Sequence, residues 1–293
     1  MEHILEVKGL SFKYEEQVVF RNIDIDVFRG DFLAFVGPNG SGKSTLMKLM
    51  VGDLQPDNGE VKLFGKRIKY FKEWSRIGYM SQQVREFNHS FPATVREIVA
   101  ANLYHQMGII KIITGNLEKK IDKALRLVDM YEYKNRKIGN LSGGQQQRVF
   151  IARTLVTEPE IIFLDEPMVG IDAGSQDEFI KLINRLNRKL NITILMVSHD
   201  IHVISSQANK IACFGKDKIH LHHADEFDYS SYFEETVGES RLLPDHSHMI
   251  KDNSATSGSS NHNCRDNENT PYQNNLEQES SSHVNNQESD SYA

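Results

Sequence analysis

The segment GPNGSGKST, residues 37–45, has the composition of a loop that binds the phosphates of a nucleotide. The apolar run DFLAFV precedes it and KSTLMKLM follows, so we expect a strand before the loop and a helix after it. Backbone N–H groups can then surround a β-phosphate, and the helix start adds partial positive charge. Lys43 is expected to reach the β- and γ-phosphates, and the Ser44 hydroxyl to ligate Mg²⁺. The expected nucleotide contacts are Gly37, Pro38, Asn39, Gly40, Ser41, Gly42, Lys43, Ser44 and Thr45.

The segment IIFLDEP, residues 161–167, places two carboxylates directly after an apolar run. Ligands of open α/β sheets lie at the carboxyl ends of the strands, so Asp165 and Glu166 are expected to face the phosphates. Asp165 would then hold Mg²⁺, directly or through water, and Glu166 would polarise the attacking water. The alternative is that Glu166 only caps the turn that follows.

Three further side chains are weaker candidates when taken singly. His199 follows the apolar run ITILMVS and could bind the γ-phosphate or the attacking water, although a lone histidine is more often structural. Gln82 follows RIGYMS, and its amide could reach Mg²⁺ or water. Tyr14 could stack its ring on adenine, or it could simply pack in a core.

A second glycine turn, LSGGQ at residues 141–145, begins another expected helix about a hundred residues after the first. This helix start is expected to bind an anion through free backbone N–H groups, as the phosphate loop does, at Ser142, Gly143 and Gly144. The phosphate loop of one chain would already enclose its own nucleotide. This turn could therefore bind the nucleotide of a second copy, related by a two-fold axis. The alternative is an ordinary helix N-cap in a tight turn.

The elements that must position these residues indicate an α/β fold. The first thirty residues alternate apolar and polar side chains, as half-buried strands do. Strands and helices then alternate, which favours a parallel sheet. One expected helix places Phe179, Leu182, Ile183, Leu186 and Leu190 on a single apolar face. Residues 85–145 are expected to form a mostly helical insertion.

Charge and composition divide the chain near residue 244. Residues 1–244 carry 32 basic and 32 acidic side chains, which argues against a nucleic-acid partner. Residues 245–293 carry 2 basic and 8 acidic side chains and are rich in Ser and Asn, so we expect a disordered tail. The two cysteines, Cys213 and Cys264, are typical of reduced thiols. No apolar run is long enough to span a membrane.

Together these motifs resemble those of the ATP-binding cassette (ABC) transporter ATPases, over essentially all of residues 1–240. GPNGSGKST matches the Walker A motif, LSGGQ the signature and IIFLDEP Walker B. The resemblance identifies Gln82 as the Q-loop glutamine, His199 as the switch histidine and Tyr14 as the adenine-stacking aromatic. It also adds Gln145 to the signature, and Asp172 as the D-loop aspartate, although VGIDAGSQ departs from the usual D-loop sequence.

The resemblance implies a P-loop ATPase core with an antiparallel β subdomain and a helical subdomain that carries the signature. It further implies ATP and Mg²⁺ as cofactors and an ATP-dependent homodimer with two composite sites. Integral membrane permease subunits would dock near residues 82–115, and an extracellular or periplasmic metal-binding protein would take part indirectly. The chain would then lie peripherally on the cytoplasmic side of the cell membrane.

Within the family, FPATVREIV and DEPMVGID are similar to segments of zinc and manganese importers. The expected function is therefore ATP hydrolysis that energises uptake of a divalent metal ion, zinc ahead of manganese. Iron chelates or export remain as alternatives, as does a soluble cassette ATPase. The last lacks support, because the chain has neither a long coiled-coil insertion nor a second cassette with a basic linker.

Overall fold

The computed structural model describes residues 2–81, 91–108, 112–198, 207–215, 219–225 and 227. Backbone contacts divide the chain into a first unit, residues 1–241, and a second, residues 242–293, and every described residue belongs to the first. The predicted tail, residues 245–293, lies outside the described residues and stays a prediction. No helix among the described residues is both long and apolar enough to cross a membrane.

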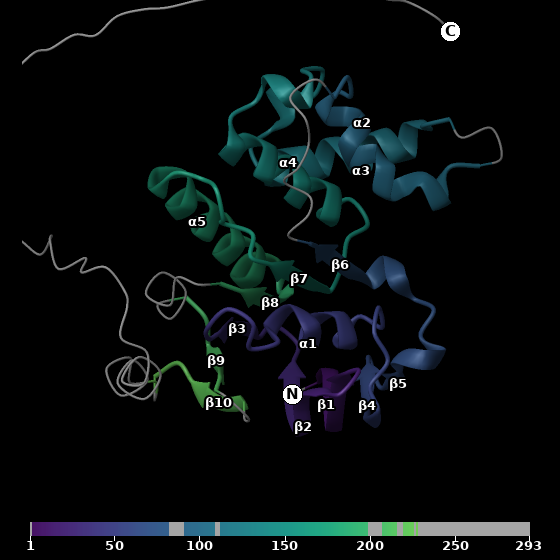
Figure 1. Cartoon of the computed structure of the whole chain (residues 1–293). Helices are drawn as coiled ribbons and strands as arrows, with labels where there is room; N and C mark the ends of the chain where they lie inside the picture. Colours follow the sequence, from purple (N-terminus) through teal and green to yellow (C-terminus); the bar gives the residue numbers. More distant parts are fainter. Residues whose placement is uncertain are drawn as a thin grey trace, which may run out of the picture. The chain divides into compact units, whose positions relative to one another are not determined.

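A six-stranded sheet forms the centre of the first unit, in the order β10-β9-β3-β8-β7-β6 (Figure 1). The strands from β9 to β6 run parallel, and β10 pairs antiparallel with β9. Strands β3, β7, β8 and β9 are buried throughout, as expected for a parallel sheet covered on both faces. The strands are β3 (Phe32–Val36), β6 (Ile77–Met80), β7 (Ile161–Asp165), β8 (Thr193–Val197), β9 (Lys210–Phe214) and β10 (Ile219–His223).

The two faces of this sheet belong to two separate cores. Because side chains alternate along a strand, Phe163 and Leu195 pack in one core, while Leu164 and Met196 pack in the other. The first core joins the sheet to helix α1 (Lys43–Met50) and to an antiparallel sheet. The second core joins it to helices α2 to α5, which Figure 1 shows on the opposite side from α1.

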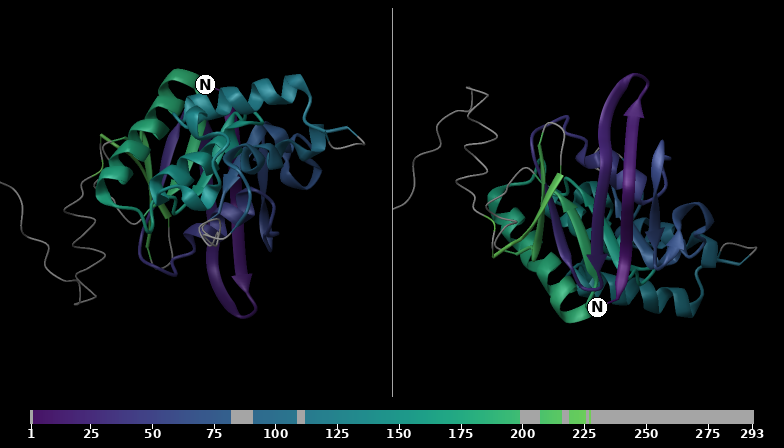
Figure 2. Two further views of the ribbon diagram at one scale, coloured as in Figure 1. Left: turned by 90° about the horizontal axis from the view of Figure 1, so that it is seen from above. Right: turned by 90° about the horizontal axis from the view of Figure 1, so that it is seen from below.

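The antiparallel sheet has the order β2-β1-β4-β5 and confirms the predicted β subdomain. Its two long strands form a hairpin, which Figure 2 shows in purple projecting along one side of the unit. Leu5 and Val7 are buried and Lys8 is exposed, but Ile4 is buried as well, so the alternation is not strict. Its elements are β1 (His3–Tyr14), β2 (Gln17–Phe28), β4 (Asn58–Leu63) and β5 (Lys66–Arg67), followed by 3-10 turns at Ile68–Tyr70 and Trp74–Arg76.

The predicted helical insertion is also confirmed in the described part of residues 85–145. Helix α2 begins with a capping box, in which Thr94 and Glu97 each accept a hydrogen bond from the other's backbone amide. The helices of this side are α2 (Val95–Ala100), α3 (Gly115–Leu127), α4 (Gly143–Leu155) and α5 (Ala173–Leu190), with 3-10 turns at Ala101–Gln106, Tyr131–Tyr133 and Ile138–Asn140.

One residue of the predicted apolar face of α5 lies elsewhere. Phe179, Leu182, Ile183 and Leu186 are buried as predicted, but Leu190 is 46% exposed. Leu190 is the last residue of the helix, and Asn191 after it turns the chain with a φ of 54°. The predicted apolar face is therefore wrong at Leu190, because the helix stops before another turn can cover this side chain.

Candidate nucleotide site

The phosphate loop connects the carboxyl end of β3 to the start of α1, as predicted. Gly42 caps this helix with a φ of 94°, in the left-handed region that favours glycine. A Cβ on Gly42 would lie 2.7 Å from both Phe20 Cζ and Val19 Cγ1. The β2 side chains thus press on the loop from outside, and only glycine fits between them and the helix.

The Lys43 side chain reaches back across the phosphate loop to the residues at its start. Its Nζ donates hydrogen bonds to the carbonyl oxygens of Gly37, at 2.9 Å, and Pro38, at 2.8 Å. Burial lowers the pKa of Lys43, while the charges of Glu166 and Asp165 oppose that shift. The loop therefore holds a buried ammonium group close to two carboxylates, in the position predicted for a phosphate ligand.

Ser44 and Asp165 lie 121 residues apart in the sequence but meet in the fold. The Ser44 hydroxyl donates to Asp165 Oδ1 at 2.7 Å. Asp165 ends β7 and is only 4% exposed. Burial raises its pKa, and the Ser44 hydrogen bond works against that rise. A buried carboxylate beside a hydroxyl offers the oxygen ligands that Mg²⁺ prefers, so this pair fits the ion of a bound nucleotide.

Glu166 follows Asp165 with a φ of 49°, which is strained for a residue other than glycine. The strand therefore ends in a turn between the two carboxylate residues. Met80 of β6 pairs with Leu164, and Val197 of β8 pairs with Asp165, so both neighbouring strands end at this edge. Gln82 and His199 follow those strands, but they lie outside the described residues and stay predictions.

Tyr14 lies at the end of β1, against the first turn of α1. Its hydroxyl is 3.4 Å from Thr45 Oγ1, and its ring meets Phe12 edge-on at 4.8 Å between centroids. Tyr14 is 46% exposed, so the alternative that it packs in a core is wrong. An exposed aromatic face beside the phosphate loop supports its predicted role as a platform for a base.

The second glycine turn forms a capped helix start. Ser142 Oγ accepts from the amide of Gln145 at 3.3 Å, and Gln145 Oε1 accepts from the amide of Ser142 at 3.1 Å. The predicted alternative of an N-cap is therefore confirmed. The anion site is still compatible with it, because the amides of Gly143 and Gly144 belong to the first turn, which has no intrahelical acceptors.

The start of α5 packs directly against this turn, a contact that the sequence did not indicate. Asp172 caps α5 by accepting from the amide of Ser175 at 3.0 Å. A Cβ added to Gly144 would lie 2.7 Å from Ser175 Oγ and 2.8 Å from Ser175 Cβ. The signature turn and the predicted D-loop aspartate therefore form one continuous surface.

We predict that alanine destabilises the protein at only one of the two neighbouring glycines. Gly144→Ala should lower the free energy of unfolding by about 1–3 kcal/mol, because the added methyl group overpacks the contact with Ser175. Gly143→Ala is the matched control, since its Cβ would meet only Ile171 Cγ2, at 3.5 Å. Urea unfolding of both variants measures the difference. Equal stability of the two would contradict the close packing of α4 on α5.

The two glycine turns of one chain begin helices on opposite sides of the central sheet. Leu46 and Met47 of α1 pack in the core shared with the antiparallel sheet. Val149 and Phe150 of α4 pack in the core on the other face. Figure 1 shows these two helices separated by the strands. Each turn is thus held by a different core of the same unit.

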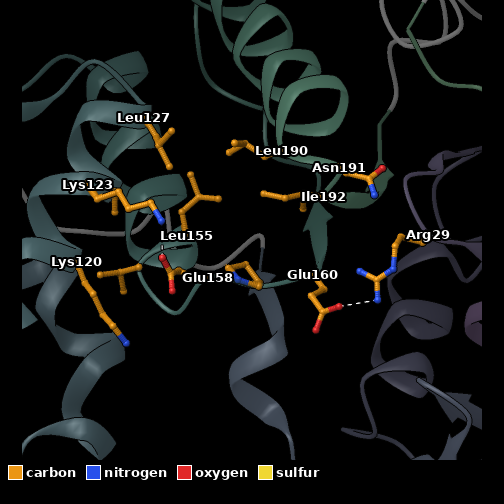
Figure 3. A pocket seen from close by; sticks show the side chains of 13 residues that line it. Arg29, Lys120, Lys123, Leu127, Leu155, Glu158, Glu160, Leu190, Asn191 and Ile192 are labelled. Carbon is orange, nitrogen blue, oxygen red and sulfur yellow. Dashed lines mark hydrogen bonds and ion pairs between the residues drawn. The ribbon is translucent and has the colours of Figure 1, made fainter.

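A cavity of about 320 Å³ lies at the opposite, amino edge of the sheet (Figure 3). Glu160 and Ile192, which immediately precede β7 and β8, line it. Glu160 is paired there with Arg29 at 2.6 Å, and Glu158 with Lys123 at 2.5 Å. Its remaining lining is mainly apolar. The cavity therefore lies away from the phosphate loop and is not part of the nucleotide site.

One polar side chain near the carboxylates was not among the residues predicted for the site. Tyr79 of β6 has a buried hydroxyl without a hydrogen-bond partner among the described residues. Burial, and then the charges of Asp165 and Asp53, raise the pKa of this phenol. The signal was a hydroxyl inside the apolar run RIGYM, one residue before the strand end.

Comparison with known proteins agrees with this geometry. A family model described as ABC transporter matches residues 20–169. The chain is 42% identical over 229 residues to the zinc uptake system ATP-binding protein ZurA of Listeria monocytogenes, covering 78% of this chain and 89% of that protein. It is 39% identical over 213 residues to the manganese transport system ATP-binding protein MntB of the same organism, covering 72% and 87%.

The fold is likewise similar to solved structures. The structure of cbiO1 from Clostridium perfringens, part of the ABC transporter complex cbiONQ, matches with a TM-score of 0.70 and 27% identity. The match covers 81% of this chain and 95% of that one.

Proposed function

The chain belongs to the ABC transporter family and is an ATPase, and from this premise we propose that it energises uptake of a divalent metal ion. Zinc is proposed first and manganese second. The order follows the relatives, since the zinc uptake protein is 42% identical and the manganese transport protein 39%. The predicted similarity of FPATVREIV and DEPMVGID to metal importers supports the same substrate class.

The observation that carries the ATPase mechanism is the meeting of Ser44 and Asp165 beside Lys43. Mg²⁺, when bound, neutralises charge on the β- and γ-phosphate oxygens. Ser44 and Asp165 would hold that ion, and the Lys43 ammonium would leave its two carbonyl partners for the phosphates. Glu166 would accept the proton of the attacking water, and His199 and Gln82 are proposed to orient that water and the ion.

We propose that two copies complete each other's sites. The signature turn of one copy, Ser142 to Gln145, would cover the phosphates held by the loop of the other, with Asp172 at the interface. The placement of the two glycine turns on opposite sides of one sheet supports this, because each can then meet the other turn of a second copy.

Separate permease subunits are proposed as the partners in the membrane, docked on residues 82–115. The chain would then lie peripherally on the cytoplasmic side, with an extracellular or periplasmic metal-binding protein delivering the ion. Coupling requires that the loaded permease and ATP favour the same closed state of the dimer.

Phe91 is expected to contribute to this docking surface. Its side chain is 42% exposed, whereas Val95 in the same segment is fully buried. Phe91→Asp should reduce co-purification of the permease more than it alters the basal ATPase rate. Tyr70→Asp is the matched control, since Tyr70 is a 66% exposed aromatic in a different subdomain. Equal loss of co-purification in both variants, or a lowered melting temperature of Phe91→Asp, would contradict the docking role.

Metal uptake itself tests the proposed substrate. Cells lacking the chain should lose most high-affinity ⁶⁵Zn uptake under zinc limitation, and the full chain should restore it. Glu166→Gln is the control that keeps the protein but removes its turnover. Normal zinc and manganese uptake in the deletion would refute the substrate class, and metal accumulation in it would indicate export.

A further inference from the structure

Three side chains of types that can ligate a metal lie together on the outer face of the antiparallel sheet, far from the nucleotide site. They are His3 and Glu6 of β1 and Asp26 of β2, and their ligand atoms lie within 4.8 Å of one another. Tyr14 marks the nucleotide end of β1, and a 12-residue strand spans about 36 Å from end to end. This cluster and the phosphate loop are therefore at opposite ends of the strand.

The strand register places two negative charges directly opposite each other. Glu6 of β1 pairs with Asp26 of β2, an arrangement that is unfavourable for like charges. Lys8 compensates in part, because its Nζ lies 2.6 Å from Asp26 Oδ2. Lys62 of β4 also lies opposite Glu6, so cations offset part of this like-charge contact. The Lys8 ion pair nevertheless uses only one oxygen of Asp26.

The second oxygen of Asp26 points to a missing partner. Asp26 Oδ1 is buried from solvent and forms no hydrogen bond with any described residue. It lies 3.7 Å from His3 Nδ1, too far for a hydrogen bond. A buried carboxylate oxygen normally accepts a hydrogen bond or contacts a cation. Leaving Asp26 Oδ1 without either partner therefore costs free energy.

The spacing of these atoms suits one ion. With metal–ligand bonds of about 2.1 Å, tetrahedral ligand atoms lie about 3.4 Å apart. The separation of His3 Nδ1 from Asp26 Oδ1 is already close to that value. His3 has a 44% exposed side chain, so small rotations can bring the remaining ligands, within 4.8 Å, to the ion.

We propose that His3, Glu6 and Asp26 form a divalent metal site that binds Zn²⁺. Zn²⁺ accepts both nitrogen and oxygen ligands, so one imidazole nitrogen and two carboxylates suit it, and water would complete the coordination. Mg²⁺ and Ca²⁺ favour all-oxygen sets, so the imidazole disfavours them. The site is separate from the MgATP site and does not depend on the transported ion.

The test is Zn²⁺ titration of the full chain by calorimetry, with excess Mg²⁺ and without nucleotide. His3→Ala should lose one Zn²⁺ equivalent or weaken that site by at least about tenfold, as expected for a lost ligand. His105→Ala is the matched control, being an exposed histidine in the helical subdomain. The histidines of the C-terminal region are present in both variants, so any Zn²⁺ that they bind contributes equally to both titrations. Identical isotherms for the two would overturn the proposal.

A substitution of Lys8 should raise the Zn²⁺ affinity, whereas His3→Ala should lower it. Lys8→Met removes the cation that competes for Asp26, so it should tighten Zn²⁺ binding by several-fold. If the cluster were only an ion-pair network, Lys8→Met would weaken the hairpin and bring no gain in affinity. Unchanged or weaker Zn²⁺ binding in Lys8→Met would therefore also overturn the site. Thermal melting without metal shows whether each variant is folded.

Discussion

Glu166→Gln is expected to reduce ATP turnover by on the order of 10²-fold or more, while ATP binding is retained. The amide cannot accept the proton of the attacking water. The phosphate loop, Ser44 and Asp165 stay unchanged, so the nucleotide still binds with Mg²⁺ and the closed dimer should accumulate. Steady-state ATPase assays and size-exclusion chromatography with ATP measure the two effects.

Glu158→Gln is the matched control for this variant. Glu158 is also a glutamate in the left-handed region, with a φ of 58°, but its partner is Lys123 at the far edge of the sheet. It should keep normal turnover and the normal response to ATP. If Glu166→Gln remained fully active and monomeric with ATP, both the role of Glu166 and the composite site would be wrong.

Ser142→Arg is expected to abolish hydrolysis and leave ATP binding by the single chain nearly intact. The large cation would fill the space that the phosphates of a second copy's nucleotide are proposed to occupy, whereas Lys43 and Ser44 remain in place. Equimolar mixing with a Lys43→Ala chain should restore at most one working site in each mixed dimer. Nucleotide affinity and turnover of the single and mixed chains measure this.

Loss of a helix cap must be separated from loss of the composite site. Ser142 and Thr94 both head capping boxes, so Thr94→Arg removes an equivalent cap from α2. Each loss should lower stability by about 1 kcal/mol. Only Ser142→Arg should stop ATP turnover of the isolated protein. Weakened ATP binding by monomeric Ser142→Arg would show that the turn acts on its own chain's nucleotide.

Local sequence was sufficient for the motifs and most of the elements. A phosphate loop needs adjacent residues with unusual backbone freedom, so GPNGSGKST between an apolar run and a helix is recognisable without the fold. The strands β3, β7 and β8 are short apolar runs followed by polar residues, and they were predicted at the observed places. The two capping boxes also depend on residues three apart.

Only the tertiary structure decided which of these elements meet. The motifs predicted that Ser44 and Asp165 hold the same Mg²⁺, but the strand order that brings them together, with β3 and β7 both paired to β8, is not encoded near either residue. The same holds for Gly144 against Ser175, and for the exposed end of α5 at Leu190. Such contacts depend on strand register and on the side of the sheet that each helix covers. Those choices minimise the free energy of the whole core, so they cannot be read from neighbouring residues.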